Sequence, residues 1–314
     1  MADATVAPAG GRLSLDQLGG NPRRHRRENR IRWWLFSAAA LSIVVNVLIV
    51  VTLSDGSIRF LTNVDLGALL ADGWFPRRGL YDIRTVVAGT FLVAAIAMLV
   101  AAPLGLGAAM YLSEYASRRR RRFLKPILEV LAGIPSVVMG YFALTWISPE
   151  IMQRFFGASG FNMGAAGIGV GILITPLVAS VAEDAMHAVP DSLREASYGI
   201  GATRRSTTIR VVFPAAVSGI VAALILGLSR AIGETLVVAI AAGGTGGSLF
   251  SLDPTKPGQT MTAAMTALAT GSDQVKGASD AFPSLFFLGI LLFAMTLALN
   301  VASERFVRRV RRRY

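Results

Sequence analysis

The sequence predicts an all-α polytopic membrane protein with six transmembrane helices. Three observations support this fold class: the composition, the length of the apolar runs, and the distribution of arginine. Of the 314 residues, 53% are hydrophobic and only 16% are charged, and the mean hydropathy is +0.55. Because charged residues make up about a quarter of a typical soluble domain, this deficit indicates a chain that lies largely in a membrane.

Six apolar runs are long enough to cross a hydrocarbon core about 30 Å thick. They cover residues 33–53, 86–112, 127–147, 165–188, 215–243 and 282–303. The first run follows a polar segment, 1–32, which we expect to be a loosely held cytoplasmic tail. It is too long for the apolar core of a signal peptide and lacks a small-residue cleavage site. We therefore expect 33–53 to be a retained first transmembrane helix.

Polar segments separate the apolar runs. Residues 54–85 are expected to form an extracytoplasmic loop, and 304–314 a basic cytoplasmic tail. Residues 148–164 and 244–281 are expected to lie on the outer side. In the fourth run, Gly167 and Gly171 are four residues apart, a spacing that allows close helix packing.

The arginine and lysine residues indicate which side of the membrane each loop occupies. Of the 31 in the chain, 23 flank the spans on the side that holds both termini, 7 lie in the opposite loops, and Arg230 lies within a span. The positive-inside rule therefore places both termini in the cytoplasm. Because the basic charge is spread over four flanks, it does not indicate a nucleic-acid surface. The run Arg118–Arg122 is expected to set topology and to contact anionic membrane lipid.

The polar stretch from Val189 to Ala216 is expected to form an elbow of two short helices. Ser192 and Glu195 fit a capping box for the first helix, and Thr203 fits an N-cap for the second. Gly201 separates the two helices, and Pro214 opens the next apolar run. Such an elbow is suited to contact with another protein, although the spacing alone also fits an ordinary basic loop.

The same stretch resembles the EAA loop of ABC-importer permeases. That pattern is E-A-A, a glycine four residues after the second alanine, and later I-x-L-P. Glu195, Ala196, Gly201 and Pro214 occupy matching positions. Ser197 replaces the second alanine, Val211 the isoleucine and Phe213 the leucine. The resemblance implies that 183–214 is a coupling loop that docks on an ATP-hydrolysing subunit, and that the fold is the type I (MetI-like) permease fold.

Two opposite charges lie within the fifth apolar run. Arg230 and Glu234 are four residues apart, so on a continuous helix they would share one face and pair. Counting from Pro214 places Arg230 about 24 Å along the helix, in the outer half of the bilayer. A charge there costs about 2.5–3.5 kcal/mol or more. The arginine is expected either to contact a translocated oxyanion or to take part in a structural pair, within this chain or between two permease subunits.

Three segments resemble the permease subunits of the high-affinity phosphate (Pst) importer, and the C-type subunit more than the A-type. They are LEVLAGIPSVVMGYFAL at 128–144, AMHAVPDSLREASYGIGATRR at 185–205 and SRAIGETLVV at 229–238. The resemblance implies a permease core over 86–303 and a substrate path that includes Arg230, Glu234, Thr235, Pro135 and Ser136. Pro135 and Ser136 are expected to distort the backbone near the gate rather than to bind the ligand.

The resemblance also implies the partners. They are phosphate, an extracytoplasmic phosphate-binding protein, a second permease subunit and two ATPase subunits. The chain itself has no P-loop sequence, no cysteine and no metal-binding spacing, so no cofactor, metal or catalytic role is expected. Alternative functions are a permease for sulfate, molybdate or tungstate, a stand-alone secondary transporter or channel, and a structural scaffold. The elbow disfavours the stand-alone carrier, and the intramembrane charges disfavour the scaffold.

Overall fold

The computed structural model describes residues 22–70, 72–244, 246–271 and 280–311. The chain divides into two units, Met1–Thr52 and Leu53–Tyr314. The described part of the first unit is one stretch of helix α2. Residues 1–21 of the expected N-terminal tail lie outside the described residues. The rest of that segment is helical and forms the start of α2, which begins at Pro22.

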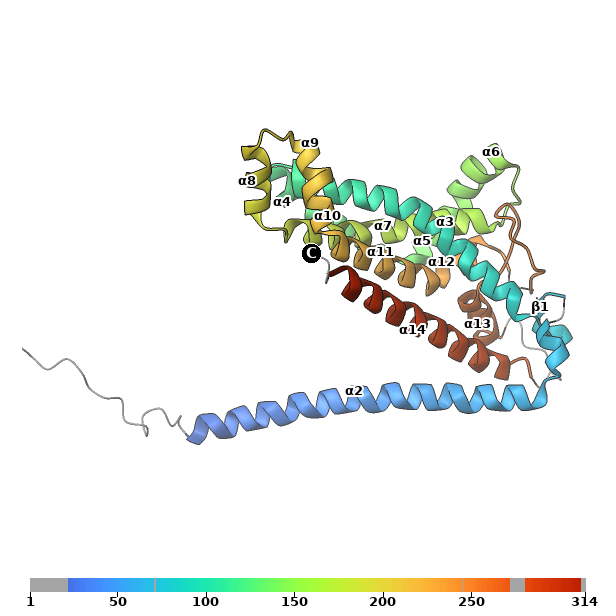
Figure 1. Cartoon of the computed structure of the whole chain (residues 1–314). Coiled ribbons are helices and arrows are strands. Elements are labelled where there is room, and N and C mark those ends of the chain that lie inside the picture. The colour runs from blue at the N-terminus through green and yellow to red at the C-terminus, as the bar shows by residue number, and fades with distance from the viewer. Residues whose placement is uncertain (1–21, 71, 245, 272–279, 312–314) are drawn as a thin grey trace, which may run out of the picture. The chain divides into compact units, whose positions relative to one another are not determined.

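Helices form almost all of the regular structure in the described residues (Figure 1). The α-helices are α2 (Pro22–Asn63), α3 (Ile83–Met110), α4 (Arg118–Ala132), α5 (Ser136–Phe142), α6 (Arg154–Phe156), α7 (Met163–His187), α8 (Asp191–Gly199), α9 (Arg204–Thr207), α10 (Phe213–Ala215), α11 (Val217–Ile232), α12 (Leu236–Ala241), α13 (Met261–Ala269) and α14 (Pro283–Arg311). The 3-10 helices are η1 (Leu66–Leu70) and η2 (Pro76–Arg78), and the π-helical segments are η3 (Tyr111–Tyr115), η4 (Ala143–Gln153) and η5 (Thr208–Val212). Strands β1 (Trp74–Phe75) and β2 (Leu80–Tyr81) pair antiparallel.

Four helices in the described residues are long and apolar enough to cross a membrane. They cover Glu28–Asn63, Ile83–Tyr115, Met163–His187 and Pro283–Arg305. Two further candidates are helix pairs, Arg118–Ala132 with Ser136–Phe156 and Arg204–Ala215 with Val217–Ile232, bent by 86° and 72°. Counting each bent pair as one span brings the number to six. The fold class predicted from the sequence, all-α and polytopic, is confirmed.

Helices α3 and α7 form the centre of the second unit and pack directly against each other. The contact depends on the two glycines at the predicted spacing. A Cβ added at Gly167 would lie 2.7 Å from Ile96 Cβ, and one added at Gly171 would lie 2.7 Å from Val100 Cβ. Because no side chain separates the backbones at these points, the two helices are closely packed, as the spacing predicts.

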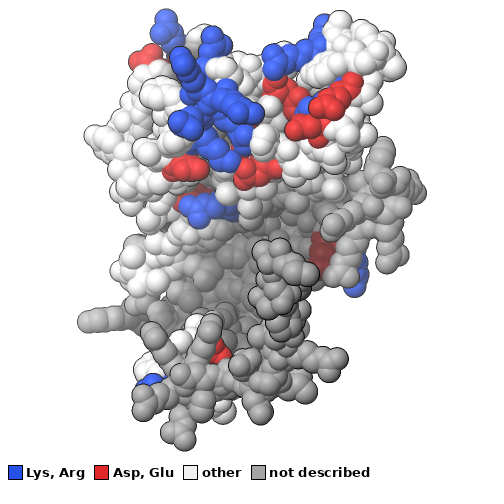
Figure 2. All heavy atoms as spheres, turned by 90° about the vertical axis from the view of Figure 1, so that its left-hand side faces the viewer, with Lys and Arg blue, Asp and Glu red and all other residues white. Residues whose placement is uncertain are grey.

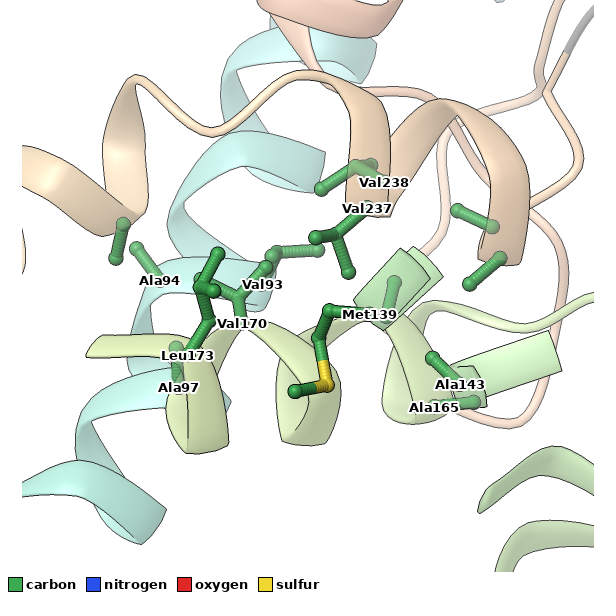
Figure 3. Close-up of a cluster of buried hydrophobic side chains, with 14 of the residues drawn as sticks. Val93, Ala94, Ala97, Met139, Ala143, Ala165, Val170, Leu173, Val237 and Val238 are labelled. Atoms are coloured by element: carbon green, nitrogen blue, oxygen red, sulfur yellow. The ribbon is translucent and has the colours of Figure 1, made fainter. Parts of the chain in front are cut away.

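The largest buried cluster surrounds this helix pair (Figure 3). Small and β-branched residues dominate it, including Val93 and Ala97 from α3 and Val170 from α7. Met139 from α5 and Val237 from α12 complete the layer. The short helices α5 and α12 are therefore held against the α3–α7 pair by apolar packing, although each is too short to be stable alone.

The third predicted span is wrong in its boundaries because 127–147 straddles a sharp bend. Helix α4 ends at Ala132, and α5 begins at Ser136 after Gly133, Ile134 and Pro135. A residue before proline avoids the helical region, so Ile134 favours the break. The helical run after the bend covers 136–156 and consists of α5, the π-helical segment η4 and α6. The predicted outer loop therefore begins later than residue 148.

The outer segment predicted over 244–281 contains a buried helix that the sequence did not indicate. Met261, Ala264 and Leu268 of α13 are fully buried. They join Phe60, Trp74 and other aromatic residues in a second cluster. Helix α13 begins at an N-cap in which the Thr260 hydroxyl accepts from the amide of Ala263. The residues that precede α13 in this segment are polar and rich in glycine. The composition of the whole segment therefore suggested a loop.

Candidate functional site

The predicted elbow is present as two short helices, α8 and α9, which lie at one end of the second unit (Figure 1). Gly201, between them, has φ +82°, a left-handed conformation that favours glycine. Thr203 caps α9 as predicted, since its hydroxyl accepts from the amide of Ser206. The predicted capping box is wrong. Helix α8 begins at Asp191 after Pro190, so Ser192 lies inside the helix and its side chain does not cap it.

Most residues of α8 are exposed. Glu195 and Ala196 are exposed, as are Leu193 and Tyr198 (43% each). Ile200, at the end of the helix, is 87% exposed. Pro214 lies on the far side of the elbow, in α10 (Phe213–Ala215). The EAA-like residues therefore combine an acidic group with apolar side chains on a surface, which suits contact with a partner protein.

Arg194 attaches the opposite face of α8 to the spans, and sequence reasoning missed it. Its Nη2 donates to Glu114 Oε1 at 3.0 Å and to the Met186 carbonyl at 2.9 Å. Its Nη1 donates to the Val189 carbonyl at 2.6 Å and to Asp191 Oδ1 at 3.0 Å. Burial disfavours the charged guanidinium, but the bonds to Glu114 and Asp191 outweigh it, so the pKa of Arg194 lies above its usual range.

A second ionic cluster joins α4 to the end of α7. Glu183 is 1% exposed and pairs with Arg121 at 2.5 Å and with Lys125 at 2.9 Å. Lys125 also pairs with Asp184 at 2.6 Å, and Arg121 lies 3.0 Å from His187 Nε2. The arginine run is thus partly structural, since Arg121 neutralises a buried carboxylate. Figure 2 shows lysine and arginine gathered at the end of the second unit that carries the elbow, with acidic residues beside them.

The helix carrying Arg230 breaks before Glu234. Helix α11 ends at Ile232, and α12 begins only at Leu236. The expected arrangement of Arg230 and Glu234 on one continuous helix face is therefore wrong. No ion pair joins them among the described residues. The bend near Ala216 also shortens the count from the start of the helix, so Arg230 lies about 20 Å along α11.

The break is stabilised by hydrogen bonds from outside α11. The Glu234 carbonyl accepts from Thr262 Oγ1 on α13 at 2.7 Å, which replaces the bond that a continuous helix would have made. Thr235 Oγ1 donates to the Gly233 carbonyl at 3.2 Å. Glycine at 233 also has a low helix propensity. The sequence could have suggested the break from Gly233, but the donor on α13 comes from a distant segment.

The charges at this break differ in exposure. Arg230 is exposed, whereas Glu234 is only 7% exposed. The buried acidic residues in the described part of the chain are Asp82, Glu114, Glu183 and Glu234. The first three each pair with an arginine or lysine at 3.0 Å or less. Among these four, Glu234 alone has no cationic partner within the described residues.

Pro135 and Ser136 lie at the other break, between α4 and α5. Pro135 is the extended residue before α5, with φ −60° and ψ 133°, and Ser136 is the first residue of the helix. The backbone distortion expected at this pair is confirmed. Their place on a substrate path stays a prediction. Within the described residues, no group of three or more His, Asp or Glu side chains is arranged to hold a metal ion.

The two broken spans and the exposed two-helix elbow agree with the permease class that the sequence resemblance implies. The chain belongs to the family described as binding-protein-dependent transport system inner membrane component, which matches residues 101–313. The resemblance to ABC-importer permeases seen in the sequence is thereby confirmed.

Several curated relatives cover most of the chain. The probable ABC transporter permease protein YqgH of Bacillus subtilis is 31% identical over 90% of this chain and 93% of its own length. The phosphate transport system permease protein PstC of Mesorhizobium japonicum is 31% identical over 87% and 88%. PstC 1 of Mycobacterium tuberculosis is 32% identical over 76% and 75%. The similarity to Pst-type permeases therefore extends well beyond the quoted motifs.

Solved transporter structures share the fold. A bacterial ABC importer of the acidic polysaccharide alginate aligns with a TM-score of 0.58 and 16% identity, covering 91% of this chain and 99% of that one. An inward-facing MetNI methionine transporter aligns with a TM-score of 0.53 and 19% identity, covering 78% and 97%. At these identities the likeness concerns architecture alone, and it confirms the MetI-like fold.

Proposed function

We propose that the chain is the permease subunit, of the C type, of an ATP-driven importer for inorganic phosphate. The observation that carries this proposal is the pair of unpaired charges at the α11–α12 break, in a chain similar to several PstC proteins. Arg230 is exposed, without an ion pair among the described residues, and has a planar guanidinium that can bind two phosphate oxygens.

The partners follow from the same proposal. The exposed face of α8, with Glu195 and Ala196, docks on an ATPase subunit, and a second permease subunit supplies the other half of the path. An extracytoplasmic phosphate-binding protein delivers the anion to the outer loops. ATP-driven closure of two ATPase subunits draws the elbows together, so the spans alternate between outward-open and inward-open states. Both termini are cytoplasmic, in agreement with the arginine bias.

Membrane lipid is a further partner in this proposal. Arg118, Arg119 and Arg122 of α4 are exposed, while Arg121 is held by Glu183. Helix α4 has no buried residues, and Phe123 on it is 69% exposed. An amphipathic helix of this kind suits a position at the inner surface of the bilayer, where its arginines meet anionic headgroups.

Uptake of radiolabelled phosphate tests the substrate. A strain lacking the gene should lose high-affinity uptake and regain it when the chain is restored with its partner subunits. Sulfate, molybdate and tungstate, each in excess, should not compete. Strong competition by one of them would indicate a permease for that oxyanion instead. Uptake by the chain without ATPase subunits would indicate a stand-alone carrier.

A further inference from the structure

Helix α8 is attached to the rest of the second unit mainly by polar contacts. Ser197 is its one buried residue, and the Ser197 hydroxyl lies 2.9 Å from that of Thr207, on α9. That contact joins the two halves of the elbow to each other but not to the spans. Apolar packing therefore contributes little to holding α8 against the spans. A movement of α8 can reach the spans only through other contacts.

Arg194 supplies a direct route into two spans at once. Its side chain is 13% exposed and that of Glu114 is 3% exposed, so the pair is largely desolvated. Two guanidinium nitrogens approach the two carboxylate oxygens of Glu114, at 3.0 Å and 3.4 Å. Glu114 lies in η3, which continues span α3. The bonds from Arg194 to the Met186 and Val189 carbonyls reach α7 and the turn that follows it.

The two spans reached by Arg194 are themselves joined. Gly167 and Gly171 bring the backbones of α7 and α3 into close contact, so the two helices form one tightly packed pair. A planar guanidinium that bonds to both helices fixes direction as well as distance. The exposed partner Asp191, with a side chain 88% exposed, adds little to this attachment.

We propose that Arg194 and Glu114 are the positioning pair that transmits movement of α8 to spans α3 and α7. The inference rests on the proposed function, in which the exposed face of α8 docks on an ATPase subunit. Arg194 itself touches neither ATP nor the transported anion. In this proposal its neighbour Glu195 contacts the ATPase subunit. Glu195 therefore serves docking, and Arg194 transmits the movement to the spans.

The test uses the complete importer, chain plus partner subunits, in proteoliposomes. The variants are Glu114→Gln, Arg194→Gln and Arg194→Lys, and the matched control is Asp191→Asn, which removes only the exposed partner of the same guanidinium. Four quantities are measured: membrane abundance, ATPase co-purification, ATP hydrolysis and phosphate uptake. A fifth is the ATP-dependent change in thiol labelling of a single cysteine at Leu236, in the otherwise cysteine-free chain.

The expected result is a loss of coupling with docking preserved. Glu114→Gln and Arg194→Gln should keep the ATPase subunits bound and hydrolysing ATP. Phosphate taken up per ATP should fall by about tenfold or more, as for loss of a buried charge-assisted hydrogen bond. The change in labelling at position 236 on adding ATP should fall in parallel. Arg194→Lys should be intermediate, since it keeps the charge but not the fork, and Asp191→Asn should match the parent.

Three outcomes would overturn the proposal. One is an unchanged uptake-to-hydrolysis ratio in Glu114→Gln. Another is loss of ATPase binding in the same variant, which would make the pair part of the docking surface. If Glu114→Gln and Arg194→Gln do not accumulate, the ratio is read in Arg194→Lys, and a parental value there counts against the pair. A parent that takes up no phosphate yet shows ATP-dependent labelling would remove the substrate assignment alone.

Discussion

Buried carboxylates at the elbow end and at the α11–α12 break have opposite surroundings. At the elbow end, Glu114 and Glu183 each contact arginine or lysine at 3.0 Å or less. At the break, Glu234 is buried with no cationic partner among the described residues, and Arg230 is exposed. The chain satisfies the charges that hold its own helices together. Among the described residues, Arg230 and Glu234 on the proposed substrate path have no ion pair, which leaves the Arg230 guanidinium available to an anion.

The largest expected effect comes from the exposed face of the elbow. Glu195→Lys or Gly201→Asp should abolish phosphate uptake while leaving the chain in the membrane. Lysine reverses the charge at the proposed contact with the ATPase subunit, and aspartate is strained at φ +82°. Uptake and ATPase co-purification are measured together. Normal uptake in both variants would remove the docking role, and lost uptake with normal co-purification would argue against docking at these positions.

Changing Arg230 tests the proposed role of the α11–α12 break in binding the anion. Arg230→Gln should lower uptake by about tenfold or more without dissociating the complex, because a charge-assisted bond to the anion is lost. Arg230→Lys should recover part of it, since lysine keeps the charge without the planar fork. If the arginine merely balances Glu234, the double variant Arg230→Gln with Glu234→Gln should transport almost normally. Near-parental uptake by that double variant, at equal abundance, would refute substrate contact.

Stability should separate the two kinds of carboxylate. Glu183→Gln leaves Arg121 and Lys125 without their shared partner and should destabilise the chain by about 1–3 kcal/mol, given that both cations are partly hydrated. Glu234→Gln changes a buried carboxyl group that has no cationic partner among the described residues, so it should leave stability unchanged or raise it, while lowering uptake because Glu234 lies on the proposed substrate path. The thermal midpoint in detergent measures both. Equal destabilisation by the two variants would show that Glu234 has a structural partner.

The smallest effect on uptake is expected from single-cysteine variants that only report which side of the membrane a residue occupies. In the cysteine-free chain, Ser159→Cys should react with an impermeant thiol reagent applied outside, and Ser117→Cys should react only after the membrane is opened. Both positions are exposed, and neither change should alter uptake. The expectation rests on the bias of 23 basic residues to 7. Reaction of Ser117→Cys from outside would place the elbow end on the extracytoplasmic side.

The sequence was sufficient for everything that depends on local composition and spacing. Apolar runs of bilayer length predicted the class and the number of candidate spans, and the spacing of Gly167 and Gly171 predicted the tight contact of α7. The residues from Glu195 to Pro214 predicted the elbow, and Thr203 its second cap. These features depend on residues that are close together in the sequence, so their physical causes are visible in the residue order.

The tertiary structure alone decided where helices break and which charges meet. Thr262, from the segment expected to be an outer loop, bonds to the Glu234 carbonyl and holds the break that separates Arg230 from Glu234. Arg194 pairs with Glu114, 80 residues earlier in the chain, and Arg121 pairs with Glu183, which is also distant in the sequence. A charge in a sequence has many possible partners of opposite sign, and only the packing of distant helices decides which of them it meets. Among the described residues, Glu234 meets none.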